Sequence, residues 1–295
     1  MANLIIYSAV FIYALFDAQT VINGAAEGVR LATTVVIPSL FPFIFLSLLF
    51  SSGISGKPIR FLRPIEKLCG MPKGSGNLLV LGLCGGYPVG AQCIESAYRQ
   101  GTLSKIEAQR LLGFCNNAGP SFIFGMVGGI LKRPELCWFL WVSQILSAII
   151  VGAVLPGRSN DTCRLRNGTP LTIPQGLEQA IHVCAKISGW VILFRALISV
   201  LEQRLIAHLP VIWRTGLAGI LELSNGCIRV QELDSIKSAY LLCGIMLAFG
   251  GFCVHLQTKS VAKDLSIRYY LLGKVLQAVI IVPILLILWK IGVAF

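Results

Sequence analysis

Helix-breaking residues interrupt two apolar runs of this sequence, and they restrict the possible folds more than any other feature. Gly85-Gly86-Tyr87-Pro88-Val89-Gly90 stands inside one run, and Asn116-Asn117 with Gly119-Pro120 stands inside the next. A break at membrane depth exposes backbone N–H and C=O groups, so it persists only where protein or a water-filled cavity faces it. The pattern therefore predicts a polar site buried in a membrane protein, and transport is the leading hypothesis.

Composition agrees with a membrane location. Hydrophobic residues make up 55% of the 295 residues and charged residues 13%, whereas soluble proteins average about 25% charged residues. The net charge is +12, and the 25 Lys and Arg residues concentrate in the short connections between apolar runs. This is the positive-inside pattern, so we expect anionic lipid, and not nucleic acid, as the partner of these charges.

Chemical motifs for metal binding or catalysis are absent from the sequence. The 10 cysteines include no CxxC pair and lie mostly in apolar runs, where Cys behaves as a small hydrophobic residue. No HExxH, GxSxG or Walker sequence occurs. We expect neither an enzyme nor a resident metal or cofactor; a coupling Na⁺ or H⁺ stays open.

The distribution of apolar runs predicts an all-α polytopic membrane protein. Two short runs, 77–98 and 216–230, fold about Gly-rich or Asn-Gly turns and are predicted to be re-entrant hairpins, while 57–68 is expected to lie in the interface. The predicted unbroken spans are 4–22, 31–52, 137–155, 187–205 and 269–290, and the predicted broken spans are 104–131 and 236–256.

The loop charges predict an orientation. With the N-terminus in the cytoplasm, the inside connections 53–76, 99–110, 156–178 and 257–268 carry fourteen Lys and Arg residues, against seven outside. In this orientation the two halves contain the same parts in the same order from opposite sides, which predicts an inverted repeat. The expected units are an N-terminal helix (1–30), a first repeat (31–155), a cytoplasmic linker (156–178) and a second repeat (179–295).

The first hairpin tip is a candidate substrate site. Gly86, Tyr87, Pro88 and Gly90 are expected to start a helix whose free N–H groups, around Val89 to Ala91, receive an anionic group. Gln92 could add a side-chain donor. The alternative is that the glycines only let helices pack closely.

Two further polar groups complete the candidate site. Glu222 stands in the second hairpin with Ser224, Asn225 and Gly226, where it could bind a coupling cation, carry a proton or receive a basic group. The alternative is an interfacial Glu222 paired with Arg214 or Arg229. Asn116, Asn117 and Ser121 flank the first broken span and could bind substrate or replace missing backbone partners, whereas the corresponding break at Phe249-Gly250-Gly251 is apolar.

The segments 85–91, 101–125 and 221–226 resemble the sporulation integral membrane proteins of endospore-forming bacteria. That family is part of the nucleoside-recognition or Gate-domain group, which is related to concentrative nucleoside transporters. The resemblance implies inverted repeats with two hairpins and a sporulation role, with dipicolinic acid as cargo across the mother-cell-derived membrane around the forespore. The motif positions it carries over are Gly86, Tyr87, Pro88, Gly90, Asn116, Asn117, Pro120, Glu222, Asn225 and Gly226.

These observations together predict an inner-membrane transporter of a small polar or anionic solute. Two alternatives stay open: a nucleoside-like permease, and a non-transporting scaffold of a sporulation membrane complex. A transporter needs the hairpin-tip residues, whereas a scaffold should tolerate changes there. The sequence also leaves a homo-oligomer open.

Overall fold

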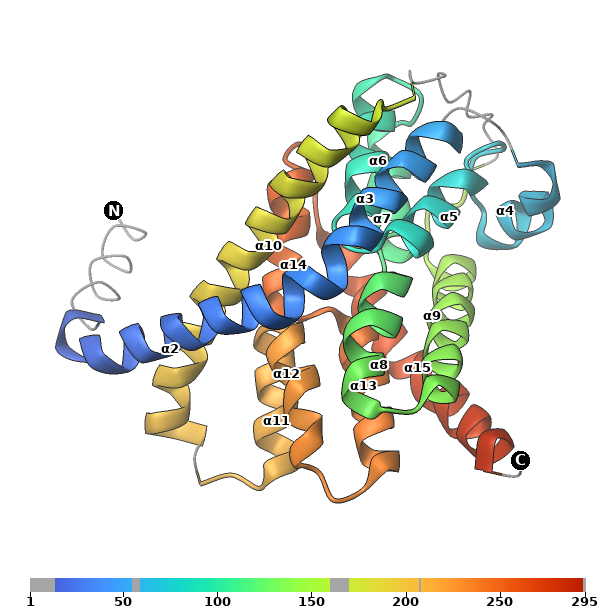
Figure 1. The fold of residues 1–295 in the computed structure, drawn as a ribbon. Helices are drawn as coiled ribbons and strands as arrows, with labels where there is room; N and C mark the ends of the chain where they lie inside the picture. The colour runs from blue at the N-terminus through green and yellow to red at the C-terminus, as the bar shows by residue number, and fades with distance from the viewer. Residues whose placement is uncertain (1–13, 55–58, 160–169, 207, 294–295) are drawn as a thin grey trace.

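The computed structural model describes residues 14–54, 59–159, 170–206 and 208–293, and every regular element in this part of the chain is a helix (Figure 1). The predicted all-α class is confirmed. Five helical segments are long and apolar enough to cross a membrane, which makes the chain a multi-pass membrane protein. These segments are Ala18–Phe50, Pro134–Val154, Ile173–Leu201, Ile236–Val261 and Arg268–Gly292.

The helices follow the order expected from the apolar runs. The first part of the chain contains α2 (Ala18–Leu31), α3 (Ile37–Ile54), α4 (Arg63–Cys69), α5 (Gly76–Gly85), α6 (Val89–Arg99), α7 (Lys105–Cys115), α8 (Gly128–Leu131) and α9 (Pro134–Val154). The second part contains α10 (Ile173–Leu201), α11 (Val211–Leu221), α12 (Leu223–Arg229), α13 (Ile236–Phe249), α14 (Gly251–Val261) and α15 (Arg268–Val293). Segments Ala32–Val36, Ser121–Val127 and Glu202–Ile206 are π-helical, and Arg60–Leu62 and Val230–Glu232 are 3₁₀-helical.

The N-terminal region differs from the prediction. We expected separate spans at 4–22 and 31–52, but α2 continues through the π-helical turn into α3 without a loop; residues 1–13 lie outside the described residues. The polar stretch between the expected spans packs against α10 instead. A Cβ on Gly24 would lie 2.6 Å from Ser199 Oγ, and one on Gly28 would lie 2.7 Å from Ile192 Cα. The small residues at i and i+4 therefore allow a close helix crossing that replaces the loop.

Short breaks divide the remaining structure, and all but one lie where the sequence predicts them. The second hairpin turns at Glu222, whereas the predicted Asn225-Gly226 turn lies inside α12. Helices α5 and α6 form a hairpin about residues 86–88, and α11 and α12 form one about Glu222. The segment 116–119 separates α7 from the helical turn that follows, and Gly250, with φ +90°, separates α13 from α14. Residues at all four breaks are buried, among them Gly86, Glu222 and Gly250.

Helix α9 is apolar on its outer face and polar on its inner face. On α9, five large apolar side chains at intervals of four residues are exposed, while the opposite face buries Ser143, Gln144 and Ser147. Such a helix suits an environment in which lipid, and not water, covers the outer surface. The exposed stripe consists of Trp138, Val142, Leu146, Ile150 and Val154.

Four connections gather at one end of the bundle. Arg158 donates to the carbonyl oxygen of Lys67 at 2.7 Å, and Arg99 pairs with Asp264 at 3.2 Å. The first contact joins α4 to the α9–α10 connection, and the second joins the end of α6 to the α14–α15 connection. The α4–α5, α6–α7, α9–α10 and α14–α15 connections lie toward the upper end in Figure 1, whereas the α12–α13 connection lies at the opposite end. The loop charges predict that these same four connections lie on one side of the membrane.

Arg110 links the C-termini of α4 and α9. Its side chain is buried, and its guanidinium donates to the carbonyl oxygens of Cys69 at 2.6 Å and Gly152 at 2.7 Å. Gly70, Leu155 and Pro156 offer further carbonyl acceptors. These carbonyls lie in or just after the last turns of α4 and α9, where helix carbonyls lack intrahelical donors and a cation is favourable.

We expect Arg110→Lys to lower the free energy of unfolding by about 1–3 kcal/mol, because a single ammonium cannot reach both helix ends and buried carbonyls lose their donors. Thermal unfolding of the purified protein in detergent measures this. Arg133→Lys is the control, since the Arg133 side chain is exposed. Equal melting temperatures for the two variants would show that Arg110 does not stabilise the two helix C-termini.

Candidate functional site

A small pocket in the interior brings both hairpin tips together. Its wall includes Gly86 and Tyr87 from the first tip and Glu222 and Ser224 from the second, with Ser121 beside the first break. Helix α14 adds Gln257, and α3 and α10 close the pocket with apolar side chains. The volume is about 40 Å³, which holds a few water molecules and falls below the roughly 300–1,000 Å³ of common ligand sites.

Glycines let the first tip touch the first break through backbone atoms. Gly86 has φ +72°, and a Cβ there would lie 2.9 Å from the Gly119 nitrogen. The tip also reaches the second break, because the Tyr87 hydroxyl donates to the Leu247 carbonyl at 3.4 Å and would lie 3.2 Å from a Cβ on Gly250. Tyr87 thus connects the two halves of the chain.

The start of α6 differs from the expectation of free N–H groups. The Gly90 N–H donates to the Gly86 carbonyl at 3.2 Å, and the Ala91 N–H donates to Asn116 Oδ1 at 3.2 Å. A Cβ on Gly90 would lie 2.6 Å from the Cys115 carbonyl oxygen. The prediction that these amides are free is therefore wrong for Gly90 and Ala91, and Gly90 serves close packing. Pro88 is buried at the N-cap position of the helix.

Glu222 occupies the turn of the second hairpin with 2% of its surface exposed. Its carboxylate accepts from the Ser224 N–H at 3.0 Å and from the Asn225 N–H and side-chain amide, both at 2.8 Å. It therefore caps the N-terminus of α12, where a negative charge is favourable. A Cβ on Gly226 would overlap the backbone of Gly219 in α11, and a Cβ on Gly219 would overlap the side chain of Met246.

The alternative ion pairs of Glu222 are not observed. Arg229 pairs instead with Glu202, and Arg214 lies 4.0 Å from Glu232. Among the described residues no cation pairs with the Glu222 carboxylate. Glu222 thus presents a buried acid at the wall of the pocket, and not an interfacial ion pair.

The asparagines of the first break lie one layer behind the pocket. Both are completely buried. Asn116 donates to Thr258 Oγ1 at 3.0 Å, and Asn117 accepts from Lys274 Nζ at 2.9 Å. The two amides therefore replace missing backbone partners and tie the break to α14 and α15.

Lys274 is the residue that sequence reasoning missed. It is fully buried, and its ammonium donates to Gln277 at 2.7 Å in addition to Asn117. Gln277 continues the network to Gln144 at 3.2 Å and Ser147 at 3.3 Å on α9. The signal was available, because Lys274 and Gln277 are polar residues inside the apolar run 269–290, and ionisable residues in such runs are functional candidates.

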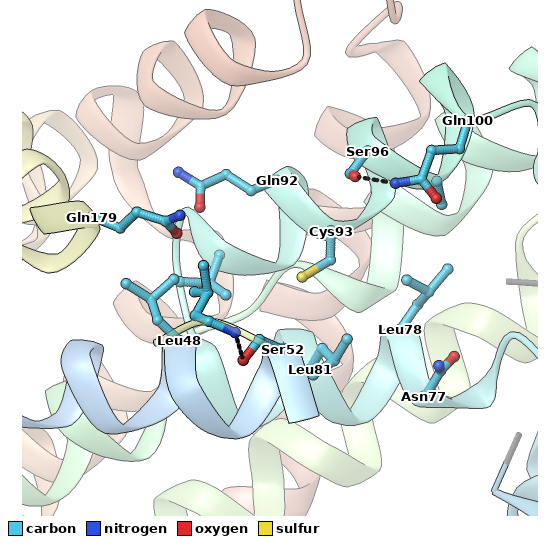
Figure 2. A pocket seen from close by; sticks show the side chains of 13 residues that line it. Leu48, Ser52, Asn77, Leu78, Leu81, Gln92, Cys93, Ser96, Gln100 and Gln179 are labelled. Atoms are coloured by element: carbon cyan, nitrogen blue, oxygen red, sulfur yellow. Dashed lines mark hydrogen bonds between the residues drawn. The ribbon is translucent and has the colours of Figure 1, made fainter. Parts of the chain in front are cut away.

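A second cavity, of about 200 Å³, lies between α3, α10 and the first hairpin (Figure 2). Gln92 lines this cavity and not the central pocket. Its wall also carries Gln100, Gln179 and Asn77, and both polar side-chain atoms of the buried Asn77 lack a protein partner. Four residues of α3 spaced by four, Leu40, Ile44, Leu48 and Ser52, run from the central pocket to this cavity.

Comparison with known proteins supports the predicted resemblance. The chain is 25% identical to the sporulation integral membrane protein YlbJ of Bacillus subtilis (strain 168), over an alignment of 324 positions that covers 92% of this chain and 78% of that protein. The chain is a homologue of this sporulation membrane protein. No protein-family model matches the chain, and no solved structure matches it significantly.

Proposed function

We propose that this protein transports a small polar or anionic solute across a membrane. The observation that supports it is the central pocket, where two hairpin tips and the first helix break meet around buried polar side chains. Irregular backbone at membrane depth is tolerated only beside protein or a cavity, and transporters place their substrates at such breaks. Because the pocket holds about 40 Å³, a solute enters only when a hairpin or a wall side chain moves.

The same proposal includes a re-entrant geometry and an inverted repeat. The order α5–α6, broken α7, whole α9 in the first half matches the order α11–α12, broken α13–α14, whole α15 in the second. Each hairpin packs against the broken helix of its own half. Two such units inserted from opposite sides would give alternating access by moving one against the other.

Sporulation is the proposed setting and dipicolinate the proposed cargo. The relative is named a sporulation protein, and the sequence resemblance implies the mother-cell-derived membrane and this dianion. The test is uptake of labelled dipicolinate, beside labelled nucleosides, into proteoliposomes that contain the purified chain. Uptake of nucleosides alone would favour the permease, and uptake of neither over empty liposomes would favour a scaffold.

The proposed orientation has its own test. In a cysteine-free variant, we expect an impermeant thiol reagent added outside cells to label a Cys introduced at Lys132 and to miss one at Arg63. Both residues are exposed; Arg63 begins α4, and Lys132 lies in the connection between α8 and α9. Labelling of position 63 alone would reverse the orientation.

A further inference from the structure

The ammonium of Lys274 is buried without a counter-ion. Among the described residues no carboxylate pairs with it, and its exposed fraction is 0%. A charged side chain inside a membrane protein is costly and is retained for a reason. The structure offers it two amide oxygens, from Asn117 and Gln277, and the ring faces of Tyr87 and Tyr270 at 5.3 Å and 5.9 Å.

The hydrogen-bond network of Lys274 joins two kinds of segment, long helices and helix breaks. Gln277, Gln144 and Ser147 lie on the long helices α15 and α9. Asn117 lies in the first break and Tyr87 at the first hairpin tip, where it lines the central pocket. The cation therefore holds the break and the tip against the two long helices, by a charge-assisted hydrogen bond and a cation–π contact.

In the described part of the chain, four other ionisable side chains lie around Lys274, and they come from four different parts of the structure. The first hairpin contributes Tyr87, α7 contributes Cys115, α15 contributes Tyr270 and α14 contributes His255. The α9 side chains in this network, Gln144 and Ser147, do not titrate. His255 contacts the Tyr270 hydroxyl at 3.2 Å through Nδ1, which makes it the competing candidate.

We propose that Lys274 binds and releases the proton that couples solute movement to a proton gradient, an inference that rests on the proposed transport function. When the amine takes up a proton, the ammonium fastens the hairpin tip and the break to α15. When that proton leaves to water, the charge-assisted bond and the cation–π contact are lost and the tip is released. Glu222 is not needed as the proton carrier, because its carboxylate caps α12.

The test uses the full chain in proteoliposomes with labelled dipicolinate and labelled uridine as probes. We expect a pH gradient of two units to raise wild-type uptake about tenfold over equal pH, below the roughly hundredfold accumulation that such a gradient can drive through one coupled proton. Lys274→Arg, which stays charged, and Lys274→Met, which stays neutral, should lose this response. His255→Gln should keep it.

The outcomes separate the transport function from the role of Lys274. Absence of wild-type uptake overturns the transport function itself. Wild-type uptake that ignores the gradient, a normal gradient response in Lys274→Arg, or a response lost only in His255→Gln overturns the role of Lys274 alone. If the Lys274 variants fail to fold, a pH indicator in weakly buffered wild-type protein reports proton exchange on solute addition, and its absence also overturns the proposal.

Discussion

Gly82→Ala is expected to disrupt the packing of the first hairpin on the first broken helix. A Cβ at Gly82 would overlap the carbonyl oxygen of Cys115, a backbone atom that cannot turn aside. Overpacking of a buried contact costs about 1–3 kcal/mol or occasionally more, and we expect the upper end here because both partners are main chain. The measurement is the melting temperature and monodispersity of the purified variant in detergent.

Gly129→Ala is the matched control for this experiment. The substitution is the same, but no atom lies within 4 Å of a Cβ at Gly129 in α8. Alanine there should leave stability unchanged or raise it slightly, because Ala is the better helix former. If Gly82→Ala melts like the wild type, the hairpin does not pack on α7 as described.

Glu222→Gln is expected to reduce transport at least about a hundredfold, because a buried acid beside the pocket is retained for its charge. The fold should survive. Glutamine keeps one oxygen for the Ser224 N–H, whereas its amide group faces the donors of Asn225, so the loss of the cap costs about 1 kcal/mol. Proteoliposome uptake together with the melting temperature separates the two effects.

Glu135→Gln provides the control for the loss of a carboxylate, since Glu135 lies at the exposed start of α9. Its uptake should equal that of the wild type. Full transport by Glu222→Gln would show that the carboxylate serves only to cap α12. An equal loss in both variants would trace the effect to overall charge instead.

The class of the fold and the positions of its breaks could be read from the chain itself. Glycine and proline in apolar runs act locally, through backbone conformation and lost hydrogen bonds, so the hairpin at residues 86–88 and the breaks at 116–119 and 250 follow from residues close in sequence. The turn of the second hairpin does not follow in this way, because it lies at Glu222 and the Asn225-Gly226 pair is helical. The membrane class follows from hydropathy, which sums over residues and needs no contacts.

Tertiary packing decided the features that join distant residues. The polar stretch with Gly24 and Gly28 became helix because α10 lies against it. The Ala91 amide is occupied because Asn116 reaches it from another helix. Lys274 meets Asn117 across 157 residues, and no local pattern encodes that contact, so its buried network emerged only when α9, α15 and the first hairpin were in place.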